Sequence, residues 1–258
     1  MLRVPSGYIG RPCLSRGDIS APEAPLHRGV SIPKIPTMQL VKSSLSVNFE
    51  TASEPWLQLR AMIRAITSDS SAEVQAAPFV FDKAEEKKRF VLAIRSVNLE
   101  HELPSSLQVA VADASKTISD LHSVSPFPKL SGIRHDALFI EPYSMPFHEL
   151  VSLVKARYLA KTALIDSAAD VGASFDIHED GAVKHIQIGP MDQKQLQSQY
   201  LRRPAEGLPE TFLFMSLGFE STSAQEYSGQ SLESFFAASN RWQVGQAEAI
   251  VKELRGEP

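Results

Sequence analysis

The residues best suited to chemistry are two histidines and an aspartate in the second half of the chain. Asp180-Gly181 is a dipeptide typical of a two-residue hairpin turn, and a turn there places Asp176 opposite His185. Because side chains alternate between the two faces of a strand, Asp176, His178 and His185 share one face. This set could ligate a divalent metal ion or act as an acid–base pair. It also suits a solvated sheet face with an ordinary cross-strand Asp–His pair.

A second group of titratable residues lies in the segment Gly132-Ile133-Arg134-His135-Asp136. Arg134 could hold an anionic group at the start of a strand, with His135 beside it. Alternation would also place Arg134 and Asp136 together on the polar side of that strand, which explains both without any activity. We therefore treat Arg134 and His135 as candidate binding residues, next to the three residues of the hairpin.

The same segment carries a resemblance to a known family. A glycine, an aliphatic residue and an arginine at 132–134 open a strand, and His135 follows them. This pattern resembles a sporadically distributed family of uncharacterised bacterial proteins, which usually has a tyrosine after the arginine and an aliphatic residue where this chain has Ser131. The resemblance covers about residues 40–258. It implies a duplicated α+β unit in a bacterial protein and implies no activity.

The elements that must position these residues are repeated along the chain. Residues 44–50 alternate between polar and apolar types, as expected of a half-buried strand, and residues 135–141 fall opposite them as a second strand 91 positions later. A helix starting near a proline follows each strand, at Pro55 and at Pro146. We interpret the repeat as an internal duplication.

Each half is predicted to run strand, helix, strands, helix. The first half covers residues 38–130, and we expect one long strand at 90–100 and a closing helix at 107–122. The second half covers residues 131–258 and contains the hairpin 173–189 as an insertion. Helices flanking hairpin-connected strands indicate an α+β fold, with a mostly antiparallel sheet and helices on one face. Two such units can share one sheet or pack face to face.

The N-terminal residues 1–37 differ from the rest in composition. They contain six prolines and show no helical or alternating period. Five basic residues against two acidic ones give a net charge of +3, so the remainder of the chain, whose total is −4, carries −7. Such a segment buries too little apolar surface to offset its chain entropy. We predict a disordered leader or a docking arm.

Composition narrows the classes of function. No apolar run approaches the roughly 20 residues of a membrane span, and an acidic body argues against binding a phosphate backbone. Cys13 is the only cysteine, which excludes an intrachain disulfide. The sequence contains no phosphate-binding loop, dinucleotide fingerprint or nucleophile elbow. We expect a cytoplasmic protein with no membrane or nucleic-acid partner and no cofactor.

Three functions stay open. The leading hypothesis is a non-enzymatic interaction or ligand-binding protein of the bacterial cytoplasm, whose partner is another protein or a small ligand. The alternative is a metal-dependent hydrolase or other enzyme that uses the hairpin face of Asp176, His178 and His185. The third is an assembly subunit whose exposed strand edge pairs with a partner.

Overall fold

A computed structural model describes residues 38–67, 77–179, 181–221 and 227–257. The leader or docking arm predicted for residues 1–37 lies outside these ranges. Within them, helices and strands alternate in the order expected of an α+β protein.

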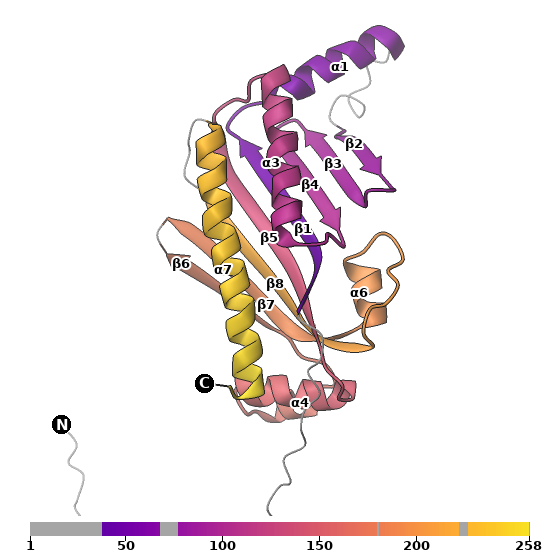
Figure 1. Ribbon diagram of the computed structural model, residues 1–258, viewed down its shortest axis with the longest axis vertical. Coiled ribbons are helices and arrows are strands. Elements are labelled where there is room, and N and C mark those ends of the chain that lie inside the picture. The colour runs from indigo at the N-terminus through magenta and orange to yellow at the C-terminus, as the bar shows by residue number, and fades with distance from the viewer. Residues whose placement is uncertain (1–37, 68–76, 180, 222–226, 258) are drawn as a thin grey trace, which may run out of the picture. The chain divides into compact units, whose positions relative to one another are not determined.

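Eight strands form one antiparallel sheet in the order β2-β3-β4-β1-β5-β8-β7-β6 (Figure 1). The strands are β1 (Gln39–Phe49), β2 (Phe79–Lys83), β3 (Lys88–Ala93), β4 (Ser96–Glu102), β5 (Leu130–Pro142), β6 (Ala173–Glu179), β7 (Ala182–Asp192) and β8 (Thr211–Ser221). The central pair, β1 and β5, joins the two halves, so both share a single sheet. The predicted α+β class and antiparallel sheet are confirmed.

Helices cover mainly one face of this sheet. They are α1 (Glu54–Thr67), α3 (Leu107–Val124), α4 (Phe147–Tyr158), α5 (Ala163–Ser167), α6 (Gln193–Gln199) and α7 (Gly229–Arg255). Helices α3 and α7 lie side by side along the strands, and α4 packs against α7 and the strands β7 and β8 (Figure 1). Helix α6 lies on the opposite face, where its Leu196 packs with Leu138 and Ile140 of β5. We call the face beneath α3 and α7 the helix face and the other the open face.

Local sequence signals account for the helix boundaries. Ser106 caps α3 by accepting a hydrogen bond from the Val109 amide at 3.2 Å. Ser228 and Ser231 form a reciprocal capping box at the start of α7, and Gly256 ends that helix with a left-handed φ of 69°. Among the described helices, none is long and apolar enough to cross a membrane.

One predicted strand is wrong. Residues 90–100 form two strands, β3 and β4, joined by a turn at residues 94–95. The apolar residues that pack into the core beneath α3 are even-numbered before the turn (Phe90, Leu92) and odd-numbered after it (Val97, Leu99). A continuous strand would keep one parity, because its side chains alternate with a period of two.

The order of strands is symmetrical about the β1–β5 pair. Hairpin β6–β7 occupies the place in the second half that hairpin β2–β3 occupies in the first. The hairpin 173–189 therefore has a counterpart in the first half, the hairpin β2–β3, whereas the sequence had led us to expect an insertion. Common descent of the two halves stays a prediction, which a superposition of their backbones would test.

Candidate functional site

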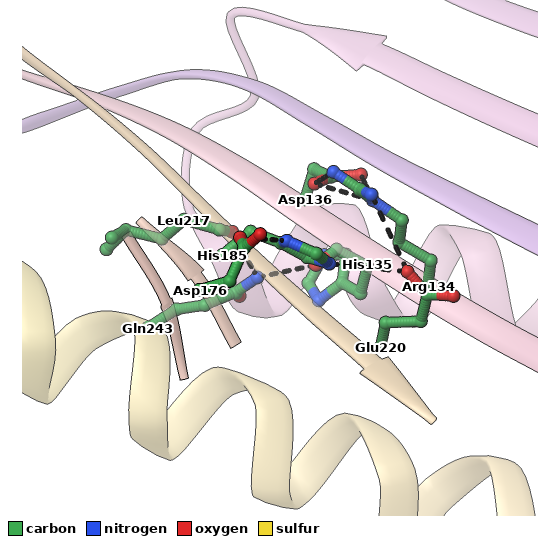
Figure 2. Close-up of polar contacts among 8 residues, drawn as sticks. All are labelled: Arg134, His135, Asp136, Asp176, His185, Leu217, Glu220 and Gln243. Carbon is green, nitrogen blue, oxygen red and sulfur yellow. Dashed lines mark hydrogen bonds and ion pairs between the residues drawn. The ribbon is translucent and has the colours of Figure 1, made fainter. Parts of the chain in front are cut away.

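The hairpin β6–β7 has the predicted register. Asp176 pairs with His185 and His178 with Val183, as expected from a turn at Asp180-Gly181. The Asp176 Oδ1 and His185 Nδ1 atoms lie 2.7 Å apart (Figure 2). The cross-strand Asp–His pair is therefore present on the open face of the sheet.

This pair continues into a network of charged side chains that crosses four strands (Figure 2). His185 Nε2 lies 3.3 Å from Oε2 of Glu220 on β8, and the same Oε2 lies 3.6 Å from Nη1 of Arg134 on β5. Arg134 forms a bidentate pair with Asp136, at 2.9 Å from Nε to Oδ2 and 2.8 Å from Nη2 to Oδ1. Hydrogen bonding to Asp136 raises the pKa of Arg134 above its ordinary value. Every charged group of this network has a partner of opposite charge or an imidazole.

Gly218 makes the network possible. It stands between Asp136 of β5 and His185 of β7 in the same cross-strand row. A Cβ at position 218 would lie 2.5 Å from Oδ1 of Asp136 and 3.2 Å from Cβ of His185. The missing side chain therefore lets the Asp136 carboxylate extend over β8. Sequence reasoning did not identify Gly218 or Glu220, because their neighbours belong to strands distant in the chain.

His178 stays apart from the network. Its side chain is exposed near the end of the edge strand β6, and it has no hydrogen-bond or ion-pair partner among the described residues. Over the same residues, no group of three or more His, Cys, Asp or Glu side chains is placed to hold a metal ion. The geometry therefore gives no support to a metal-dependent hydrolase built on Asp176, His178 and His185.

His135 lies on the helix face, opposite to its neighbour Arg134. Its imidazole is 1% exposed and lies between two hydroxyl groups, with Nδ1 2.9 Å from Ser239 Oγ of α7 and Nε2 3.0 Å from Ser43 Oγ of β1. Burial lowers the pKa of His135 to about 4, so the ring is neutral at pH 7. The structure separates His135 from the other candidate residues and gives it contacts inside the core.

Gln243 is a second polar contact between α7 and the sheet. Its buried Nε2 donates hydrogen bonds to the carbonyl oxygens of His135 on β5 and Leu217 on β8, both at 2.9 Å (Figure 2). Together with Ser239 it ties the middle of α7 to the central strands. A further polar contact lies near the end of the helix, where Arg255 pairs with the buried Glu141 of β5.

A groove lies elsewhere, between α3 and strands β2, β3 and β4. This groove has a volume of about 690 Å³. Its apolar walls come from both the sheet and the helices α1 and α3, and include Leu45, Leu59, Phe81, Phe90, Leu99 and Leu121. Sequence reasoning did not identify the groove, because its walls come together only in the folded sheet.

Small side chains on α3 leave this space open. Ala110 and Ala114 of α3 line the groove. Alanine side chains fill little of the space between the helix and the sheet, so the groove stays open at these two positions.

One end of the groove is polar. Lys88 Nζ lies 2.8 Å from Asp113 Oδ2 and 3.1 Å from Glu86 Oε2, and hydrogen bonding to Asp113 raises the pKa of Lys88. His101 stands beside them, 3.7 Å from Asp113, and burial lowers its pKa. Its Nδ1 atom is buried without a hydrogen-bond partner. The groove therefore has apolar side chains along its walls and a cluster of polar side chains around His101.

Comparison with known proteins gave no assignment, because no protein-family model and no curated protein matches the chain.

Proposed function

We propose that this protein is a binding protein that holds an elongated amphiphile, an aliphatic chain with a polar head, in the groove between α3 and strands β2–β4. The observation that carries the proposal is the groove itself. Its volume of about 690 Å³ lies within the range of small-molecule sites, and its lining combines aliphatic and aromatic side chains with charged ones. A small ligand was one of the two partners expected from the sequence.

The dimensions favour a long molecule. Lining residues on α3 extend from Ala110 to Val124, which corresponds to roughly 20 Å of helix at 1.5 Å per residue. The apolar chain would lie toward Leu59 and Leu121. The head would lie toward His101, where a polar group could satisfy an imidazole nitrogen whose missing hydrogen bond costs free energy.

The charged groups around the groove support binding rather than catalysis. Lys88 is paired with Asp113 and Glu86, and Lys116 is paired with Asp120. The acidic and basic side chains in these pairs already hydrogen-bond to each other. A bacterial origin and a cytoplasmic location, both expected from the sequence, stay predictions.

The test uses an environment-sensitive naphthalene sulfonate dye and its displacement by a long-chain saturated fatty acid. We expect saturable displacement with one site per chain. Ala114→Trp fills the groove and should abolish it, whereas Val109→Trp, at a position 44% exposed on the same helix, should leave it unchanged. Phe81→Ser removes an aromatic wall that is already 47% exposed and should weaken fatty-acid binding by roughly tenfold.

Thermal melting of each variant separates loss of binding from loss of folding. The proposal fails if folded Ala114→Trp and Phe81→Ser proteins bind the fatty acid as well as the parent chain does. It also fails if the parent chain shows no saturable binding.

A further inference from the structure

The sheet ends on one side in an edge strand that is open to pairing. Strand β6 is the outermost strand next to β7, and its seven residues pair with β7 in one unbroken register. Its outward N–H and C=O groups have no strand partner among the residues that the structure describes. Unbroken edge strands are templates for pairing with another strand, and proteins usually protect them with prolines, bulges or very short length.

The opposite edge also exposes apolar side chains, Val80 at 48% and Phe81 at 47%, but its strand is shorter. Strand β2 has five residues and follows Pro78, which cannot donate a hydrogen bond. Strand β6 contains no proline and no bulge. It also presents two large apolar side chains on the helix face, Phe175 and Ile177, which are 42% and 40% exposed. With respect to the part of the chain that the structure describes, the β6 edge therefore combines seven residues of unpaired outer backbone groups with two partly uncovered apolar side chains.

We propose that β6 pairs with β6 of a second copy of this chain, antiparallel and centred on Ile177. Two Ile177 side chains then meet at the two-fold axis on the helix face. On the open face, Asp176 lies opposite His178 of the partner subunit, and this contact occurs twice because of the symmetry. The product is one continuous sheet made of two eight-stranded sheets.

The pattern of charges selects this register. Residues directly opposite each other in an antiparallel pair point to the same face of the sheet, whereas neighbours along a strand point to opposite faces. The two-fold axis must therefore pass through a residue of β6 and not between two residues. A centre at Asp176 would set two carboxylates directly opposite each other, which is destabilising. A centre at His178 would set two imidazoles opposite each other and Glu179 opposite the partner's Ile177. Centring on Ile177 pairs Asp176 with the partner's His178 and isoleucine with isoleucine, and it sets Phe175 opposite the partner's Glu179. Centring on Phe175 would instead set Asp176 opposite the partner's Ser174 and leave His178 opposite the partner's Gly172, without an acidic partner.

The same register gives His178 a partner. It is the one candidate residue of the hairpin outside the charged network, and none of the described residues pairs with it. The proposed interface is independent of ligand binding, because the groove lies under α3 at the opposite end of the strand order. Self-association and groove binding can therefore succeed or fail separately.

Sedimentation equilibrium of the full chain tests the interface over a range of concentrations. We expect the parent chain to approach twice its mass of 28.4 kDa. His178→Asp places a carboxylate opposite the partner's Asp176 at both symmetric contacts, whereas His178→Lys places an ammonium group there. The dissociation constants of these two variants should differ by roughly tenfold or more, with His178→Asp the weaker dimer.

A third variant, Ile177→Lys, tests the contact at the two-fold axis. It brings two ammonium groups together and should give a monomer. Because all three substitutions are at exposed positions, thermal melting should show that the variants remain folded. A parent chain that stays monomeric throughout overturns the proposal. So does a dimer that His178→Asp and His178→Lys weaken equally, or one that all three variants leave intact.

Discussion

The Nδ1 atom of His135 lies 2.9 Å from Oγ of Ser239, and this contact joins the central strand β5 to helix α7 inside the core. Ser43 of β1 holds the other ring nitrogen at 3.0 Å. A neutral imidazole has one N–H donor and one acceptor nitrogen, so one hydroxyl accepts a hydrogen bond and the other donates. One buried ring therefore connects both central strands to the longest helix.

Ser239→Ala should lower the free energy of unfolding by about 1–3 kcal/mol, because it leaves a buried ring nitrogen without a partner. Urea denaturation measures this loss. Ser152→Ala is the matched control, since Ser152 lies on the exposed side of α4 and its hydroxyl contacts only the His148 carbonyl. The control should change stability by less than about 0.5 kcal/mol. Equal effects of the two substitutions would show that the His135 contact contributes nothing.

The stability of the protein should depend on pH through His135. Burial lowers the pKa of this residue from 6.5 to about 4 in the folded chain. Between these values the unfolded chain binds a proton that the folded chain does not, so the free energy of unfolding falls as the pH decreases from 6.5 toward 4. The loss should be about 2 kcal/mol at pH 5 and should level off below pH 4.

Other groups also titrate in this range, so the measurement is a difference between two proteins. Urea denaturation of the parent chain and of His135→Gln at a series of pH values isolates the contribution of the imidazole. We expect the parent chain to lose stability more steeply than the variant between pH 6.5 and 4. Parallel profiles would contradict a change in the protonation of His135 on unfolding.

Gly218→Ala should destabilise the fold by about 1–3 kcal/mol, because the added Cβ would meet the Asp136 carboxylate at 2.5 Å and force it away from Arg134. Gly245→Ala in α7 is the matched control, since a Cβ there meets no atom within 4 Å. Replacing a helical glycine by alanine in open space should stabilise the protein by about 0.5–1 kcal/mol. Thermal melting of both variants checks the opposite signs, and a stabilising Gly218→Ala would contradict the close approach.

The parts of this structure that could be predicted from the sequence depend on near neighbours along the chain. The dipeptide Asp180-Gly181 selects a tight turn, and the turn sets the register that pairs Asp176 with His185. Alternation of polar and apolar residues likewise predicted strand β1. The break between β3 and β4 was not predicted, because residues 90–94 are all apolar and show no alternation that would mark which of them face the core.

Tertiary structure decided which distant residues meet. Pairing of β5 with β8 brings Arg134 to Glu220, and packing of α7 buries His135 on the face opposite to Arg134. Neither the order of strands in the sheet nor the helix above a given strand can be read from local periodicity, because periodicity reports only that a face is buried and not what covers it. The charged network and the groove under α3 depend on those non-local contacts, and both therefore became visible only in the folded chain.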